Sequence, residues 1–389
     1  MRFVTLIKNP ILYAFIFFSF LIRAVCGAEE ETEQQKENNS LISDLPINDR
    51  LLRIKKSSLP ENELERQYVV EEYFSEHLPT VTDKGDHFEI RLERPSSPYG
   101  SYMLDPEIHE KLGWWKPGTR VRDIPVEKRF LNGGIFVMED QWTPLSWSMH
   151  FQKRGAILEE LILLHVDDHK DMMSPRIGQN SDGQYFDFIT KNSFSLLNPE
   201  SVTSAILSGA LGKGSILSPL IWQVDKIHVR HLTVRPNPYT YSLKKTLVQD
   251  TILGDSLSRI ILEQKEIEED VSLLNTSNYI ATSNIDTWLN HLPGGVPIFL
   301  HIDMDFFNNR FDGNSSWQDA DRQYDPSLEM QQILVEKIFN VLKDRDLEGR
   351  IVDVSLCLSP SFFPAEFWQP VSEMILNKLR LMGLCNEII

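Results

Sequence analysis

The stretch Leu161–Val166 (LILLHV), followed directly by Asp167–Asp171 (DDHKD), decides the fold and points to the chemistry. A short run of apolar residues predicts a strand buried on both faces, as in a parallel sheet that is covered by helices. The run then changes abruptly into aspartates and a histidine. Carboxylates gathered at the end of a buried strand repel one another and resist loss of water, and a bound metal ion relieves both costs.

A second stretch has the same form. Val296–Ile302 (VPIFLHI) is followed at once by Asp303-Met304-Asp305. Side chains at alternate positions of an extended chain share one face, so each motif should present its ionisable residues together. Carboxylate oxygens with an imidazole nitrogen suit Mn²⁺, Fe²⁺ or Zn²⁺ better than Ca²⁺, and these ligands are enough for two ions. The predicted metal ligands are Asp167, His169, Asp171, Asp303 and Asp305.

Strand-like and helix-like segments alternate from about residue 130 onward. This alternation is typical of an α/β domain with a mostly parallel sheet and helices on both faces, in which sites form at the carboxyl ends of strands. Asp325 with Pro326, and Pro364 with Gly383, are the clearest helix-boundary signals. Strands are predicted around 88–92 and at 133–138, 159–166, 219–224, 296–302 and 350–357, and helices at 61–77, 143–153, 199–211, 283–292, 326–343 and 364–382.

The chain before the main domain falls into three parts. Residues 1–28 carry positive charge and the apolar run Ile11–Ile22, which is short for a membrane span and typical of a signal peptide. The acidic tract 29–50 predicts a disordered linker. We interpret residues 51–129 as an N-terminal elaboration that packs on the main domain, which spans 130–389.

The N-terminal segment predicts the secretory pathway, with the protein either secreted or held in a periplasmic or lumenal space. The alternative is an uncleaved segment that anchors the chain in a membrane. Cys357 and Cys385 show no CxxC spacing and leave either one disulfide or two buried thiols open. The formal net charge of −17 argues against nucleic acid as a partner, and it would draw a cationic substrate toward the protein.

The motifs resemble those of the ureohydrolase superfamily, which includes arginase, agmatinase and formiminoglutamase. The chain looks closest to the uncharacterised branch that includes peptide arginases, which convert arginine side chains in peptides to ornithine. The resemblance covers nearly all of the main domain. Its most specific stretches are Leu164–Asp171 and His301–Phe307, and weaker ones are Val137–Gln141, Gly214–Pro219 and Leu358–Pro364.

The resemblance implies a three-layer arginase/deacetylase-like fold, two Mn²⁺ ions, and a small-molecule or peptide substrate that bears a guanidinium group. Asp167 and Asp303 would bridge the two ions. His169 and Asp305 would complete one metal site, and Asp171 would serve the other. A metal-bridging hydroxide would attack the guanidinium carbon, and the tetrahedral intermediate would release urea. Asp167, His169 and Asp303 are thus the residues expected at the centre of catalysis.

The sequence departs from the family at several positions. The family takes a further histidine ligand from the preceding strand, where Gln141 aligns here and His150 is the nearest histidine. No histidine between Asp171 and His228 offers the usual proton shuttle. Glu366 is a weaker candidate for binding a cationic substrate, and an exposed glutamate in a first helical turn is the alternative interpretation.

Two further histidines stand beside the acidic motifs. His165 and His301 each precede an aspartate, and we expect them to point to the opposite side of their strands and to pack there rather than bind metal. The arginase Asp-Pro that follows D-x-D is Asn308-Asn309 here, in keeping with the branch.

Two other functions remain open at the level of sequence. A Mn²⁺-dependent glycosyltransferase of the secretory pathway would use Asp303-Met304-Asp305 on a nucleotide sugar and Ile11–Ile22 as its anchor, but it leaves Asp167, His169 and Asp171 without a role. A catalytically degenerate arginase-fold module that binds a partner is the non-enzyme alternative. Gln141, a poor metal ligand, is the main argument for it.

Overall fold

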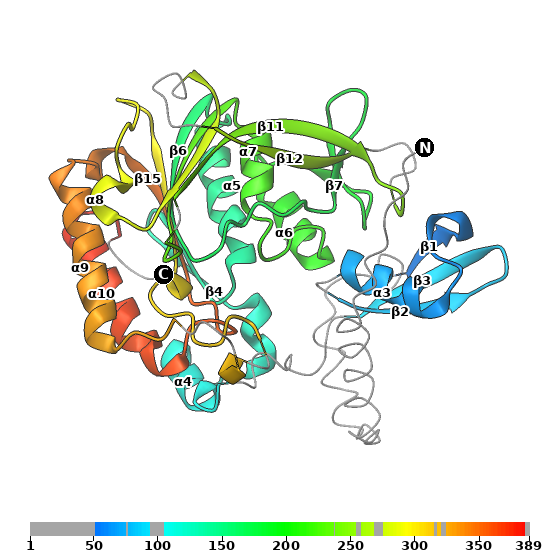
Figure 1. Cartoon of the computed structure of the whole chain (residues 1–389), viewed down its shortest axis with the longest axis horizontal. Coiled ribbons are helices and arrows are strands. Elements are labelled where there is room, and N and C mark those ends of the chain that lie inside the picture. Colours follow the sequence, from blue (N-terminus) through cyan, green and yellow to red (C-terminus); the bar gives the residue numbers. More distant parts are fainter. Residues whose placement is uncertain are drawn as a thin grey trace. The chain divides into compact units, whose positions relative to one another are not determined.

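The computed structural model describes residues 51–74, 77–93, 105–236, 238–253, 258–267, 275–314, 317–319 and 324–385 (Figure 1). The described residues all belong to one compact unit. The predicted signal segment and acidic linker lie outside the described residues. Within those ranges, no helix combines the length and apolar character that crossing a membrane requires.

A large mixed sheet with parallel central strands forms the centre of the described chain. Strand β6 shows why this part is buried on both faces. Leu161 and Leu163 pack in one apolar cluster, whereas Ile162 and Leu164 pack in the other. In spatial order the parallel strands are β5 (Gly134–Val137), β15 (Ile351–Cys357), β14 (Ile298–Asp303), β6 (Glu160–Val166), β10 (Lys226–Leu232) and β13 (Asn278–Thr282).

Antiparallel strands extend this sheet at both edges. At one edge, β4 (Lys128–Leu131) pairs with β5. At the other, β13 is followed by β11 (Tyr239–Gln249), β12 (Ser258–Glu266), β7 (Ile177–Gln179), β8 (Tyr185–Asp187) and β9 (Ser193–Phe194). The prediction of a mostly parallel sheet is thus confirmed for the central strands, whereas the sheet as a whole is mixed.

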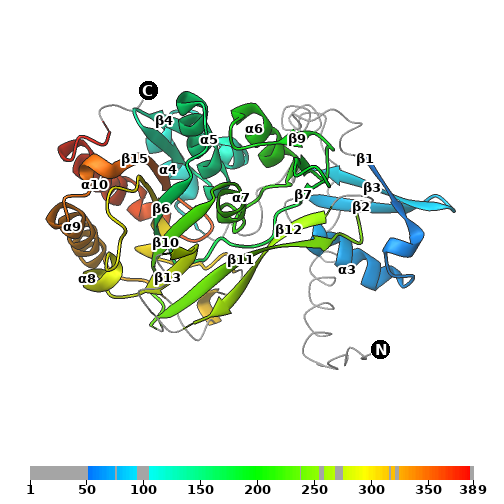
Figure 2. The same cartoon turned by 90° about the horizontal axis from the view of Figure 1, so that it is seen from above.

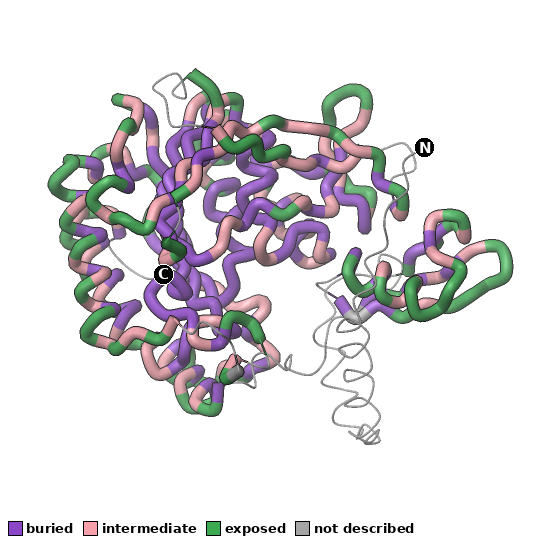
Figure 3. The backbone as a smooth tube through the Cα atoms, in the orientation of Figure 1, coloured by how far each residue is buried: buried purple, intermediate pink, exposed green. Residues whose placement is uncertain are grey.

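Helices cover the two faces of the central strands (Figures 1 and 2). The first apolar cluster joins one face to α5 (Thr143–Arg154), α6 (Pro199–Ser208) and α7 (Leu217–Gln223). The second joins the other face to α4 (Ile108–Trp115), α8 (Ile285–Trp288), α9 (Leu328–Asp344) and α10 (Trp368–Leu381). Figure 3 shows the strands between these layers as the most continuously buried part. The described chain is therefore a mixed α/β structure that is compatible with the predicted three-layer domain.

A small antiparallel sheet precedes the main one, in the order β1 (Leu51–Lys55), β3 (His87–Glu93) and β2 (Leu78–Asp83). Helix α3 (Glu63–Tyr73) accompanies it and begins at Asn62, whose side chain accepts two backbone N–H groups. The Tyr73 hydroxyl donates to Asp250 at 2.8 Å, and Arg176 donates to the Tyr73 carbonyl at 2.8 Å. These bonds tie the small sheet to the main one.

Short 3₁₀ turns complete the described structure. They are η2 (Lys56–Ser58), η4 (Val121–Val126), η5 (Asp140–Trp142), η7 (Met304–Phe306), η8 (Trp317–Asp319), η9 (Glu348–Arg350) and η10 (Ala365–Phe367). Two of them carry acidic residues of the candidate site: η7 begins directly after β14, and η5 begins shortly after β5. They therefore set the direction of those side chains.

Most predicted elements are confirmed, but one predicted strand was wrong and several strands were not predicted, among them β10, β11, β12 and β13. Residues predicted as a strand at 219–224 belong to the helix α7. A short apolar run does not distinguish a buried strand from a buried helix. In the unpredicted strand β10, polar and apolar residues alternate as far as Arg230, yet His228, Arg230 and His231 are all almost fully buried.

Of two predicted helix boundaries, the start of α9 was wrong and the end of α10 is confirmed. Helix α9 begins after Ser327, whose side chain accepts the Met330 N–H, so the predicted start at Asp325 was wrong. The Asp325 carboxylate instead accepts a bond from Asn308. Gly383 follows α10 with a φ of 72°, which confirms it as the residue that ends this helix. Cys357 and Cys385 are both buried free thiols.

Candidate metal centre

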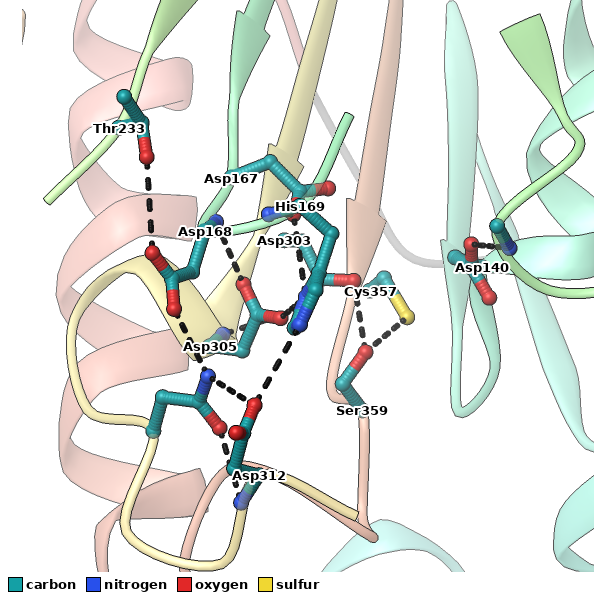
Figure 4. A network of polar contacts seen from close by, with 12 residues as sticks. Asp140, Asp167, Asp168, His169, Thr233, Asp303, Asp305, Asp312, Cys357 and Ser359 are labelled. Atoms are coloured by element: carbon teal, nitrogen blue, oxygen red, sulfur yellow. Dashed lines mark hydrogen bonds and ion pairs between the residues drawn. The ribbon is translucent and has the colours of Figure 1, made fainter. Parts of the chain in front are cut away.

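The two acidic motifs meet at the carboxyl edge of neighbouring strands (Figure 4). Strands β6 and β14 are parallel, and His165 pairs with His301. The aspartates that follow on the two strands, Asp167 and Asp303, therefore lie next to each other at the same edge of the sheet. His169 places its Nδ1 atom 2.7 Å from Oδ2 of Asp305, which lies 136 residues away along the chain. The Asp168 N–H donates to Oδ1 of Asp305 at 3.1 Å. The structure therefore joins the two motifs in one cluster.

Turns, rather than extended chain, set the direction of these side chains. Oδ1 of Asp167 accepts the His169 N–H at 2.6 Å. Oδ1 of Asp303 accepts the Asp305 N–H at 3.1 Å in the same way. Bonds of this kind, from an aspartate to the backbone two residues on, form Asx turns. Asp171 lies beyond the first turn with a φ of 50°, so the predicted alternation along one extended face was wrong.

Three of the five predicted ligands lie close enough to share an ion. The ligand atoms of Asp167, His169 and Asp305 are within 4.8 Å of one another. Asp171 and Asp303 lie near enough for their negative charges to act on Asp167. The turns therefore bring the predicted residues to one region, although the side chains do not follow the alternation of an extended chain.

Among the described residues, the charges that act most on Asp167 are those of other carboxylates. Burial first, and then neighbouring carboxylates, raise the pKa of Asp167 and of Asp303 well above the usual range. Burial also raises the pKa of Asp171 to about 6, although the His169 charge acts in the opposite direction. Oδ2 of Asp167 and Oδ2 of Asp171 are buried without a hydrogen-bond donor. Such oxygens fit a divalent cation, which would relieve the repulsion.

The structure corrects the expectation for Gln141. Its side chain donates to a backbone carbonyl at 3.0 Å and to Glu139 at 3.1 Å, and so is directed away from the cluster. The buried neighbour Asp140 lies in η5, after Met138 and Glu139 at the end of β5, and Figure 4 shows it with Cys357 and Ser359 between it and the cluster. The Gly214 N–H approaches its Oδ2 at 3.5 Å, and its charge helps to raise the pKa of Asp303. Because its charge acts on Asp303, Asp140 is the candidate ligand after this strand.

Three buried histidines, His165, His231 and His301, form a row on neighbouring strands; His165 and His301 lie two residues before Asp167 and Asp303. Register pairs His165 with His301 on one side and with His231 on the other. The ring centroids of His165 are 5.1 Å from His301 and 4.7 Å from His231. His165 Nε2 lies 3.7 Å from Oδ2 of Asp167, so His165 shares the face of the aspartate. The prediction that these histidines point to the opposite side was wrong, because residues two apart share a face; their burial is confirmed.

Hydrogen bonds define the tautomer of each histidine in the row. His231 Nε2 lies 2.8 Å from the Asp167 carbonyl, and His165 Nε2 lies 3.0 Å from the His169 carbonyl. A carbonyl only accepts, so both Nε2 atoms carry a proton. His165 Nδ1 is then the acceptor for His301 Nδ1–H at 2.9 Å. Burial lowers the pKa of His165 to about 4 and that of His231 well below its usual value, so both rings are neutral, and both donate to the backbone of the first motif. The ligand atoms of His165, Asp167 and His301 also lie within 4.8 Å of one another.

The other candidate residues lie outside the cluster. Glu366 is occupied by an ion pair with Arg310, which also pairs with Asp325 at 3.0 Å. His150 is half-buried on α5, with its ring centroid 5.3 Å from that of Phe299. The structure therefore gives neither Glu366 nor His150 a place beside the acidic residues.

Sequence reasoning missed several residues that support the cluster. The Ser359 hydroxyl donates to Oδ2 of Asp303 at 2.6 Å, and it comes from the weakly matching stretch after β15. Asp168, central in the first motif, is held by Arg235 at 3.3 Å and by Asn309 at 2.9 Å, so its carboxylate supports the turn. The position of Asp168 between two candidate ligands was the available signal, whereas Arg235 and Asn309 carry none in the sequence.

No protein-family model and no curated protein matched the chain. The ureohydrolase resemblance therefore stays a prediction from the motifs.

Proposed function

We propose that this protein is a binuclear metal-dependent hydrolase of a linear C–N bond, most concretely of the guanidinium of arginine in a peptide. Water would be consumed, and ornithine and urea would be produced. The observation that carries the proposal is the cluster of Asp167, His169 and Asp305, whose ligand atoms lie within 4.8 Å of one another, together with the unpartnered, buried carboxylate oxygens of Asp167 and Asp171. A divalent cation would compensate these carboxylates when they release their protons.

The donor set suggests how two ions would be held. Asp167 and Asp303 would be shared between two ions, as the resemblance to the ureohydrolases implies. The imidazole of His169 with Asp305 would complete one site. Asp171 and the neighbouring Asp140 would complete the other, from oxygen atoms alone. Carboxylates with one imidazole suit Mn²⁺, with Fe²⁺ or Zn²⁺ as alternatives.

The residues of the chain would bind and orient the substrate around this centre. A bound metal pair would supply Lewis-acid polarisation and lower the pKa of a water molecule. The neutral histidine row donates to the carbonyls of Asp167 and His169, which holds the first motif in its turn. Ser359 fixes Asp303 in the same manner. The net charge of −17 would steer a cationic guanidinium toward the protein.

Two contacts favour this proposal over the alternatives. The glycosyltransferase hypothesis leaves His169 without a role, yet His169 lies 2.7 Å from Asp305. The degenerate-module hypothesis relied on Gln141 as the poor metal ligand at this position, whereas the carboxylate of Asp140 is close enough for its charge to act on Asp303.

The test is the metal content of the purified protein after Mn²⁺ loading, in the wild type, in Asp303→Ala, and in Asp353→Asn. Asp353 is a matched control, because it is a buried carboxyl on β15 that bonds to Ser146 rather than to the cluster. We expect about two Mn per chain in the wild type and the control, and a loss in Asp303→Ala.

The loaded wild type should then release urea and form ornithine from arginine-containing peptides, with free arginine and agmatine as comparison substrates. Absence of bound Mn²⁺, Fe²⁺ and Zn²⁺ in the wild type would contradict the metal centre. Bound metal without urea from any of these substrates would contradict the guanidinium as substrate.

A further inference from the structure

The ring of His169 lies between two carboxylates. Its Nδ1 is 2.7 Å from Oδ2 of Asp305 inside the cluster, and its Nε2 is 3.5 Å from Oδ1 of Asp312 at the rim. A histidine that binds a metal is neutral, gives one nitrogen to the ion and keeps its proton on the other. Because Nδ1 faces the cluster, Nε2 is the atom that must keep the proton, and Asp312 is the acceptor beside it (Figure 4).

Asp312 is held in place by a reciprocal pair of hydrogen bonds. The Asn309 side-chain amide donates to Oδ1 of Asp312 at 3.1 Å, and the Asp312 N–H donates back to Oδ1 of Asn309 at 3.1 Å. Asn309 also donates to Asp168 at 2.9 Å, which connects this turn to the first motif. Asp312 has a φ of 47°, in the left-handed region that non-glycine residues seldom adopt. The turn thus maintains an unfavourable backbone conformation that directs a carboxylate toward His169.

A phenylalanine orients the same ring from another direction. Phe362 meets His169 edge to face, with centroids 5.2 Å apart. A Cβ atom at Gly313 would lie 3.0 Å from the Phe362 ring, so the glycine after Asp312 permits this approach. The turn that carries Asp312 and the aromatic ring therefore leave His169 little freedom to rotate.

We propose that Asp312 is a positioning residue that keeps the proton on Nε2 of His169 when a metal ion replaces the Nδ1 proton, which is donated to Asp305 in the structure. This inference rests on the proposed metal centre. Asp312 is not itself proposed as a ligand, because its side chain is 60% exposed and bonded within its own turn. Carboxylates in this role typically contribute a factor of about 10 to 100 in metal affinity.

The test compares Mn²⁺ binding by calorimetry in the wild type, Asp312→Asn, Asp312→Glu and Asp346→Asn. Asp346 is the matched control, an exposed aspartate with a φ of 54° at the end of α9, outside the cluster. Asparagine tolerates the left-handed region, so both Asn variants should keep the backbone. We expect Asp312→Asn to weaken one Mn²⁺ by about 10- to 100-fold and leave the other unchanged, with partial recovery in Asp312→Glu.

A second readout reports the tautomer directly. In the Zn²⁺-loaded, ¹⁵N-labelled wild type, the His169 ring should show a protonated Nε2 and a metal-bound Nδ1, and this pattern should become mixed in Asp312→Asn. Equal Mn²⁺ affinity in Asp312→Asn and Asp346→Asn, with an unchanged His169 spectrum, would overturn the role of Asp312 while the metal centre stands. Failure of the wild type to bind metal would instead overturn the proposed function. Equal thermal unfolding of the metal-free variants confirms that folding is not the cause.

Discussion

At the scale of single residues, the ligand types could be predicted from the sequence, but their directions could not. An apolar strand that ends in Asp167 or Asp303 marks the carboxyl edge of a sheet. This position could be predicted because it requires only the pattern of an apolar run followed by an aspartate. Beyond the strand, a turn determines where each side chain points, and a turn depends on hydrogen bonds that no spacing reveals. Gln141 was therefore chosen over Asp140, although η5 directs Gln141 away from the cluster.

The pair Asp140 and Gln141 gives a direct test of this correction. Asp140→Ala should lower Mn²⁺ content from about two ions toward one, because it removes a carboxylate from the all-oxygen site. Gln141→Ala should keep both ions and lose about 1 kcal/mol of stability with its buried hydrogen bonds. Elemental analysis and urea denaturation measure the two effects. If Gln141→Ala loses the metal and Asp140→Ala retains it, the assignment of Asp140 is wrong.

At the scale of elements, the long amphipathic helices and the most apolar strands could be predicted, whereas β10 could not. The periodicity of α9 and α10 distinguishes a buried face from an exposed one. The sequence of β10, KIHVRHL, alternates as a half-exposed strand would, but its polar side chains are buried because partners from other elements satisfy them. Arg230 bonds to Asn278 at 2.7 Å, and His231 bonds to the Asp167 carbonyl. Those partners lie far away along the chain.

The His231 bond predicts that β10 stabilises the first motif. His231→Leu would leave the buried Asp167 carbonyl without this donor, so the free energy of unfolding should fall by about 1–3 kcal/mol. Mn²⁺ affinity should fall as well, because the turn that carries the ligands is loosened. Chemical denaturation and calorimetry measure the two changes. His109→Leu, at an exposed position of α4, is the control and should change neither. An unchanged stability in His231→Leu would contradict the structural role of the row.

At the scale of the whole molecule, metal and protons compete for the same carboxylates. The folded pKa of Asp167, Asp171 and Asp303 is raised above the unfolded value. The metal-free folded state therefore keeps protons that the unfolded state has released. The stability that these retained protons contribute is fully present below about pH 4. It is lost as pH rises through the folded pKa, which for Asp171 is about 6. The neutral histidine row opposes this trend in acid, because His165 has a pKa of about 4, below its unfolded value.

We expect added Mn²⁺ to raise the melting temperature more at pH 7.5 than at pH 5.5. Deprotonated carboxylates bind metal more tightly, and a ligand that binds only the folded state stabilises it in proportion to the logarithm of its concentration over Kd. Thermal unfolding at both pH values, with Mn²⁺ or with a chelator, measures the difference. Asp303→Ala should abolish the shift at both. A larger shift at pH 5.5 would show that the buried carboxylates are not the ligands.

The strand order also has a consequence for synthesis of the protein. Strands β5 and β6 are consecutive parallel strands along the chain, yet β15 and β14 lie between them in the sheet. The ribosome makes these two inner strands after the other described strands of the same sheet. Until residue 357 has left the exit tunnel, β5 and β6 present open edges that other chains can pair with. The nascent chain therefore exposes these edges until β15 has been made, and the acidic cluster closes only after that.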